Sequence, residues 1–253
     1  MKKKIAALSM AACMAASVTA CGGSKPAETT AAATEAETTA AESAAEESSA
    51  EETKAAADIE TVTPGKLTVA TSPDFAPYEF YAIGEDGTPK LAGFDMDLAQ
   101  YIADYLGLEL EVVTVDFDGV ISELQTKSVD LGMAGLSPDE KRMGIMDFSD
   151  LYYMGGQSLV TVKDNAEKYN SFEAINKPDV SVGAQVGSIQ MDLANENSPE
   201  ADIVGLPKVT DIISELLTGK MDAAYIETDV AKSYQQNYPE LEIVMDVPYE
   251  SKG

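Results

Sequence analysis

The chain has 253 residues, a formal net charge of −27, two cysteines, no histidine and no tryptophan. Without histidine and with so few cysteines, most zinc sites, thiol nucleophiles and serine–histidine triads are excluded, so we expect no metal and no cofactor. The negative charge argues against nucleic-acid binding, because phosphate neutralisation needs clustered lysines and arginines.

The first twenty residues have the features of a secretory signal peptide. Three lysines follow Met1, the short apolar stretch Ile5–Ala16 comes next, and small residues lead to Cys21. A cysteine directly after small residues resembles the lipobox of bacterial lipoproteins, in which this sulfur receives a diacylglycerol. We therefore predict a signal peptide at 1–20 and lipidation at Cys21. An ordinary signal peptide with an incidental cysteine is the alternative.

A low-complexity segment follows, and we predict a lipidated, disordered acidic tether over residues 21–60. Gly22–Asp58 consists mostly of Ala, Glu, Thr and Ser and contains no aromatic residue. Such a composition cannot bury enough apolar surface to offset the entropy of ordering. A flexible coil of this length spans on the order of 35 Å. The alternative, one Ala-rich helix, is weakened by the many Thr and Ser residues.

From about Thr61 onward, short apolar runs alternate with amphipathic helix patterns. We expect strands at Leu67–Ala70, Leu110–Val115, Val129–Ala134, Val180–Ala184, Ile203–Leu206 and Ala223–Ile226. We expect helices through Phe94, Leu98, Ile102 and Leu106 with an end at Gly107, and at Gly119–Thr126, Ser188–Asn195, Asp211–Thr218 and Asp229–Gln236. Strand–helix–strand alternation predicts an α/β fold with parallel strands covered by helices.

One internal repeat indicates two equivalent halves. Ile121–Gly135 and Ile213–Glu227 match without a gap at six of fifteen positions, including the block Ile-Ser-Glu-Leu and the Asp before each strand. Ligands of open parallel sheets bind beyond the carboxyl ends of strands. If each half is one lobe, the strand ends near Gly135 and Glu227 face each other across a cleft. Chance similarity between two helix–strand units is the alternative.

The first strand end leads into a helix start that carries Arg142. Gly135 leaves room for a ligand, and Ser137 before Pro138 predicts a helix cap. Arg142 then projects from the first turn, and its guanidinium can hold a carboxylate through two parallel hydrogen bonds. A surface arginine that pairs with Asp139 or Glu140 is the alternative.

The second half offers complementary groups. Gln185 ends a strand, and Gly187 and Ser188 begin the next helix, where free N–H groups attract anions; a simple strand–helix turn is the alternative. Glu227 is suited to an ammonium group, unless it is merely an exposed carboxylate. Phe75 and Phe117 are candidate walls for the apolar part of a ligand, although Phe117 also fits a core position. Together these groups suit an α-amino acid.

The chain resembles polar-amino-acid-binding proteins of ATP-binding-cassette importers. The resemblance covers about Lys66 to Gly253 and includes the runs ATSPDFAPYEF, GFDMDLAQYIADYLGLELEVV, DFDGVISELQTKSVDLGMAGLSPDEKRM and DFSDLYY. It implies the type II periplasmic-binding-protein fold, with two hinge-linked α/β lobes that close over the ligand. Lobe 1 is then 61–155 with 247–253, and lobe 2 is 156–246.

The resemblance also implies roles for particular residues. The carboxylate-binding arginine falls on Arg142, its backbone and hydroxyl partners on Gly135 and Ser137, the stacking rings on Phe75 and Phe117, the helix-start contact on Gly187 and Ser188, and the ammonium-binding acid on Glu227.

Three departures from the family pattern leave the side-chain specificity open, and a fourth concerns the length of the chain. Glu227 stands where Asp is common, and Ile189 stands where a carboxylate-binding Thr is common. Ser72 stands where basic-amino-acid binders have Asp, with Asp74 two residues later. Family members continue past the second hinge and return to lobe 1 with more helix, whereas this sequence stops at Gly253. We therefore expect that lobe 1 lacks part of its helical cover, unless the sequence is truncated.

We therefore expect a monomeric, non-enzymatic protein on the extracytoplasmic face of the cell membrane, held there by its lipid anchor. It binds a free amino acid and delivers it to the permease of an importer. The sequence identifies neither the amino acid nor the permease. The alternatives are a ligand-sensing module of a receptor and a lyase that acts on a prephenate-like acid.

Overall fold

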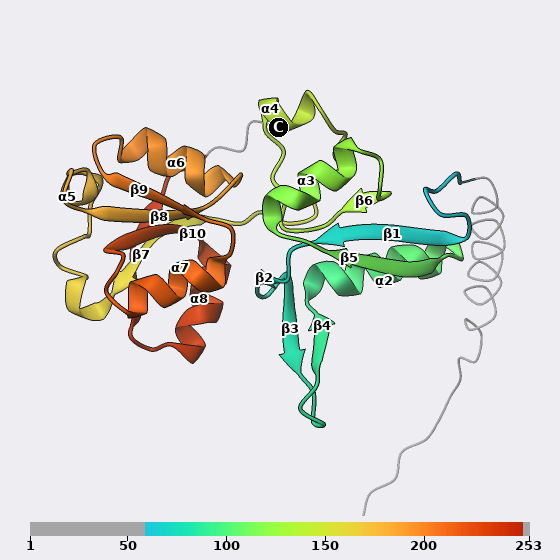
Figure 1. The fold of residues 1–253 in the computed structure, drawn as a ribbon, viewed down its shortest axis with the longest axis horizontal. Coiled ribbons are helices and arrows are strands. Elements are labelled where there is room, and N and C mark those ends of the chain that lie inside the picture. The colour runs from blue at the N-terminus through green and yellow to red at the C-terminus, as the bar shows by residue number, and fades with distance from the viewer. Residues whose placement is uncertain (1–58, 250–253) are drawn as a thin grey trace, which may run out of the picture. The chain divides into compact units, whose positions relative to one another are not determined.

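A computed structural model of the protein describes residues 59–249 (Figure 1). The predicted signal peptide, the lipidation site Cys21, almost all of the predicted tether and residues 250–253 lie outside the described residues. Within residues 59–249, no helix combines the length and the apolar character that crossing a bilayer requires.

Lobe 1 is built on a three-stranded parallel sheet with one helix on each face (Figure 1). Its strands in spatial order are β5 (Glu109–Thr114), β1 (Lys66–Thr71) and β6 (Leu131–Gly132). Its two longer helices are α2 (Phe94–Leu106) and α3 (Phe117–Gln125). Successive side chains of a strand point to opposite faces. Leu67 and Val69 therefore pack with the Ala99 and Ala103 side of α2, whereas Ala70 packs with α3.

Lobe 1 also contains elements that the sequence patterns do not predict. They are the antiparallel strands β2 (Asp74–Phe75), β3 (Glu79–Ile83) and β4 (Pro89–Ala92). The short helix α4 (Glu140–Met143) corresponds to the predicted helix start that carries Arg142. The helix cap predicted at Ser137 is wrong, because the N-cap of α4 is Asp139. The carboxylate of Asp139 accepts the N–H of Arg142 at 2.8 Å and also pairs with its guanidinium, which a serine hydroxyl cannot do.

Lobe 2 is built on a five-stranded mixed sheet covered on both faces (Figure 1). Its strands in spatial order are β11 (Leu241–Val247), β7 (Gln157–Val162), β10 (Ala223–Glu227), β8 (Ser181–Gln185) and β9 (Asp202–Leu206). Its helices are the 3₁₀ turn η2 (Lys163–Asn165), α5 (Phe172–Ile175), α6 (Ile189–Asn197), α7 (Val209–Leu217) and α8 (Thr228–Asn237). Tyr225 packs with α5 and α6, and its neighbours Ala224 and Ile226 pack with α7 and α8.

The predicted elements agree with the observed ones at the level of position and type. Each predicted strand and helix overlaps an observed one, with ends that differ by no more than two residues. Only the core of the predicted strand before Gly135 is paired, as β6. At the lobe boundary, Val247 pairs with Gln157 in the sheet of lobe 2, although the sequence places it at the start of the second part of lobe 1.

The internal repeat corresponds to two helix–strand units with the same local structure. Thr126 and Thr218 each end their helix with a hydroxyl that donates to the carbonyl four residues earlier. The next residues, Lys127 and Gly219, both have a left-handed backbone, with φ of 56° and 70°. Further on, the carboxylate of Asp130 accepts a backbone N–H at β1, and Asp222 does the same at β8. The two lobes therefore present equivalent strand ends to the site.

Candidate functional site

A cavity of about 180 Å³ is lined by residues of both lobes and of the segment between them. Seven of the predicted site residues line it: Phe75, Phe117, Gly135, Ser137, Arg142, Gln185 and Glu227. Residues 148–155, which connect lobe 1 to β7, form a further part of the wall. The two strand ends that the repeat singled out therefore share one cavity.

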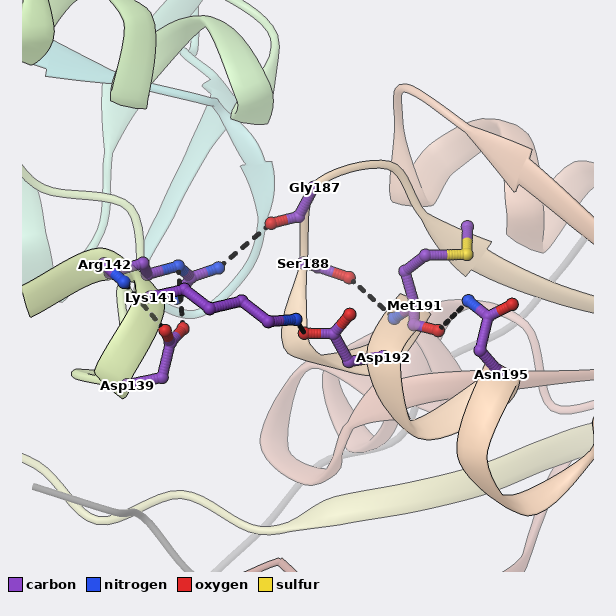
Figure 2. A network of polar contacts seen from close by, with 8 residues as sticks. All are labelled: Asp139, Lys141, Arg142, Gly187, Ser188, Met191, Asp192 and Asn195. Atoms are coloured by element: carbon purple, nitrogen blue, oxygen red, sulfur yellow. Dashed lines mark hydrogen bonds and ion pairs between the residues drawn. The ribbon is translucent and has the colours of Figure 1, made fainter. Parts of the chain in front are cut away.

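Arg142 is buried at the edge of the cavity and is held in a fixed orientation (Figure 2). Its Nε lies 3.3 Å from a carboxylate oxygen of Asp139. Its Nη1 and Nη2 donate to the carbonyls of Ser137 at 2.9 Å and Gly187 at 3.1 Å. A guanidinium has five N–H groups, so these contacts leave two for a ligand. The alternative interpretation was a surface arginine that pairs with Asp139 or Glu140. The pairing with Asp139 is present, but Arg142 is buried.

The electrostatics of this position favour a bound anion. Burial lowers the pKa of Arg142, and the charge of Asp139 opposes that shift. A guanidinium nevertheless stays charged at neutral pH. The guanidinium also lies over the ring of Phe117, 5.6 Å from its centroid, so the ring restrains it from below.

The start of α6 is occupied by contacts within the protein (Figure 2). The hydroxyl of Ser188 donates to the Gln185 carbonyl at 2.7 Å and accepts the Met191 N–H at 3.2 Å, as an N-cap. The Gly187 carbonyl is the acceptor for Arg142. Gly187 and Ser188 do not line the cavity in the described structure, so their contact with a ligand stays a prediction.

Glu227 is buried at the end of β10 and faces the cavity. One carboxylate oxygen accepts the N–H of Val230 at 2.8 Å and caps α8. The other accepts the hydroxyl of Tyr78 at 3.4 Å. Burial raises the pKa of Glu227, and its hydrogen bond from Val230 opposes this. The alternative of an exposed strand-end carboxylate is therefore wrong.

Asp74 connects the two lobes, and Ser72 supports its carboxylate. Asp74 accepts the backbone N–H of Val209 at the start of α7 and, at 3.4 Å, the amide of Gln185. Ser72 donates to the other carboxylate oxygen at 3.0 Å. A helix N-terminus attracts a carboxylate, which explains why Asp74 points to α7. Neither residue lines the cavity, and a direct ligand contact stays a prediction for both.

Aromatic rings form more of the wall than the sequence indicated. Phe75 stacks on Tyr78 with a centroid distance of 5.7 Å, and Tyr78 meets Tyr153 edge-on at 5.4 Å. Tyr152 lines the cavity as well. The run DFSDLYY contains Tyr152 and Tyr153, but no periodicity marks them, because they lie in an irregular segment. Phe117 both lines the cavity and belongs to the core of lobe 1.

A pair of hydrogen-bonded glutamines also lines the cavity, and the sequence patterns did not predict it. Gln190 on α6 donates to Gln157 at the start of β7 at 2.8 Å, and both line the cavity. Each glutamine is nearly buried. Gln190 is two residues after the helix cap Ser188, so its place in the first turn of the predicted helix is a signal in the sequence.

Comparison with known proteins gives consistent results. A family model described as bacterial extracellular solute-binding proteins, family 3, matches residues 67–241. The arginine-binding extracellular protein ArtP of Bacillus subtilis is 34% identical over 192 residues, which cover 74% of this chain and 72% of ArtP. A cyclohexadienyl dehydratase of Pseudomonas aeruginosa is 29% identical over 177 residues, covering 70% of this chain and 65% of that protein.

Solved structures agree with this assignment. An amino-acid ABC transporter substrate-binding protein of Streptococcus pneumoniae, solved with L-arginine bound, is 37% identical. It superposes with a TM-score of 0.68, and the match covers 71% of this chain and 75% of that one. The predicted two-lobe, type II periplasmic-binding-protein fold is therefore confirmed. The chain belongs to the bacterial extracellular solute-binding proteins, family 3.

Proposed function

We propose that this protein binds a free α-amino acid without changing it and delivers it to the permease of an ABC importer. The observation that carries the proposal is that Arg142 of lobe 1 and Glu227 of lobe 2 line one cavity. An α-carboxylate pairs with the two remaining N–H groups of the guanidinium, and an α-ammonium pairs with the carboxylate. A zwitterion therefore joins both lobes and favours their closure.

A cationic amino acid fits the charges of the cavity best. The charged residues among its lining are Arg142, Glu227 and Asp150. Once the zwitterion has paired with Arg142 and Glu227, Asp150 remains as an acid for a positive side chain. ArtP and the Streptococcus pneumoniae protein are arginine binders by name or by bound ligand. L-arginine is therefore the first amino acid to test.

The closing of the lobes is supported by contacts that already cross between them. The Arg142 guanidinium donates to Gly187 at 3.1 Å, and the Lys141 ammonium lies 2.9 Å from the carboxylate of Asp192 (Figure 2). The first contact is partly buried and involves a buried arginine, whereas the second is exposed. Exposed ion pairs contribute little, about 0–1 kcal/mol, so the buried arginine is the contact that couples closure to the ligand.

A thermal-shift screen of the twenty free amino acids tests the proposal. A ligand at about 100 times its Kd stabilises the folded state by about 2.7 kcal/mol. We expect a clear rise in the unfolding temperature with L-arginine or a related cationic amino acid, and full recovery of that amino acid by chromatography. If none of the twenty raises the unfolding temperature, amino-acid capture is ruled out.

The similarity to a dehydratase makes an enzyme the alternative function, and a second experiment tests it. Incubation with a prephenate-like cyclohexadienyl acid separates the two functions, because a lyase converts the acid to an aromatic product that absorbs in the ultraviolet. We expect no product, since Arg142 and Glu227 are placed to hold opposite charges of one ligand. Formation of the aromatic product identifies an enzyme.

We also propose that Cys21 carries the lipid anchor and that the following acidic segment tethers the binding lobes outside the cell membrane. The support is the order of charged, apolar and small residues before Cys21, and two or more acyl chains anchor a protein stably. Wild-type protein should sediment with membranes, whereas Cys21→Ser should stay in the soluble fraction. Equal sedimentation of both proteins contradicts lipidation at Cys21.

A further inference from the structure

Two carboxyl groups are fully buried behind the wall of the cavity. Glu79 on β3 and Asp95 in the first turn of α2 both have 0% exposed surface. Among the described residues, neither oxygen of Glu79 has a hydrogen-bond partner. Buried polar groups are almost always hydrogen-bonded. An unpaired buried carboxyl group destabilises the fold, so the presence of this pair points to a role other than stability.

The contacts of Asp95 supply that explanation. One carboxylate oxygen accepts the N–H of Gly135 at 3.1 Å, and the other accepts the hydroxyl of Tyr152 at 3.0 Å. Gly135 and Tyr152 both line the cavity. They come from different segments, the strand end before Arg142 and the connection between the lobes. Asp95 is therefore a single anchor point behind two parts of the wall.

The backbone at Gly135 makes this anchor specific. Its φ of 56° is left-handed, and a Cβ at this position would lie 2.9 Å from the ring of Phe75. A glycine turn that packs so closely on an aromatic ring has little room to shift. The hydrogen bond from the Gly135 N–H to Asp95 fixes the same turn.

The surroundings of the two carboxyl groups differ. The pKa of Glu79 is raised well above its ordinary value, chiefly by burial and further by the charges of Asp95 and Asp74. Burial also raises the pKa of Asp95, but the hydrogen bonds from Gly135 and Tyr152 lower it, and the start of α2 favours a negative charge. Two like charges buried side by side repel each other, so protonation of one carboxyl group favours ionisation of the other.

We propose that Asp95 is a positioning residue for the ligand cavity, which fixes the Gly135 turn and the Tyr152 ring through its two hydrogen bonds. The inference rests on the proposed function only for its effect on amino-acid affinity. The Gly135 hydrogen bond exists without a ligand and can be tested alone.

Three variants at position 95 test the acceptor role. Asp95→Leu removes both acceptor oxygens. Asp95→Ser leaves a hydroxyl too short to reach both donors, and it serves if the leucine variant does not fold. Asp95→Asn is the conservative variant, because its amide oxygen can still accept from Gly135 while the Tyr152 hydroxyl turns to accept from its NH₂ group.

The first readout is amide hydrogen exchange of Gly135 by NMR in the ligand-free protein. We expect exchange at least about tenfold faster in Asp95→Leu or Asp95→Ser, the order expected when a hydrogen bond to a charged group is lost. Asp95→Asn and Glu79→Gln should keep the slow exchange of the wild type. Asp97→Leu is the matched control, since Asp97 is exposed in the same helical turn.

The second readout is the affinity for whichever of the twenty amino acids raises the unfolding temperature of the wild type most. We expect it to fall at least about tenfold in Asp95→Leu and to stay within about threefold in Asp97→Leu. Wild-type exchange at Gly135 in Asp95→Leu and Asp95→Ser overturns the inference. If no amino acid binds the wild type, the proposed function fails, and the exchange rates still decide the role of Asp95.

Discussion

Replacement of Arg142 by alanine should weaken amino-acid binding by about 3–5 kcal/mol, or roughly two to four orders of magnitude in Kd. The reason is that the variant leaves the buried α-carboxylate of the ligand without its charged partner. The same change removes the hydrogen bond from Arg142 to Gly187, which crosses between the lobes at 3.1 Å. Titration calorimetry with the amino acid found in the thermal-shift screen measures the loss.

Arg142→Lys should recover little of this affinity. The guanidinium contacts Asp139, Ser137 and Gly187 at once, whereas an ammonium is a point charge without the planar fork. Lys141→Ala is the matched control, because Lys141 is the neighbour of Arg142 in the chain. The side chain of Lys141 is 79% exposed and pairs with Asp192 at the surface. We expect that control to change the affinity by less than about 1 kcal/mol. An unchanged Kd in Arg142→Ala would remove Arg142 from the binding site.

The alternating elements of both lobes could be predicted because their pattern is local. A helix such as α2 is marked by apolar residues at helical spacing, and strands such as β8 by short buried runs. The strands β2 and β3 could not be predicted from the sequence, because they are short and pair only with each other and with β4. Their position depends on tertiary contacts of Asp74 and Glu79, which no periodicity records.

The site was predictable where its residues follow strand ends and not where they depend on the fold. Glu227 ends β10, and Arg142 lies on α4, the helix that follows the equivalent strand β6, so topology brings them to one cavity. Asp74 follows a strand as well, but the start of α7 lies nearby and takes its carboxylate. Tyr152 and Asp95 meet at 3.0 Å although 57 residues separate them, and only coordinates reveal that contact.

Replacement of Glu227 by glutamine should weaken binding by about 1.5–3 kcal/mol, the range for a hydrogen bond to a charged group. The variant removes the negative charge that faces the α-ammonium. Its amide oxygen can still accept the Val230 N–H that Glu227 now accepts at 2.8 Å, so we expect α8 to keep its cap. Calorimetry at a pH above the raised pKa of Glu227 measures the difference.

The pH dependence of binding identifies the group responsible. Burial raises the pKa of Glu227 above its ordinary value of 4.5, so the wild type should lose affinity as the pH falls through that raised pKa. Of the neighbours, Asp229 has a lowered pKa and stays ionised over this range, and the pKa of Tyr78 is raised far above it. Glu227→Gln should bind weakly with a flat profile.

Asp211→Asn is the matched control, because Asp211 is an exposed acid in the first turn of α7 and should leave both the affinity and its pH profile unchanged. A wild-type profile retained in Glu227→Gln would assign the titration to another carboxyl group. The cavity would then bind the carboxylate end of its ligand through Arg142 without an acidic partner at the ammonium, and carboxylic acids that lack an amino group should bind as tightly as amino acids.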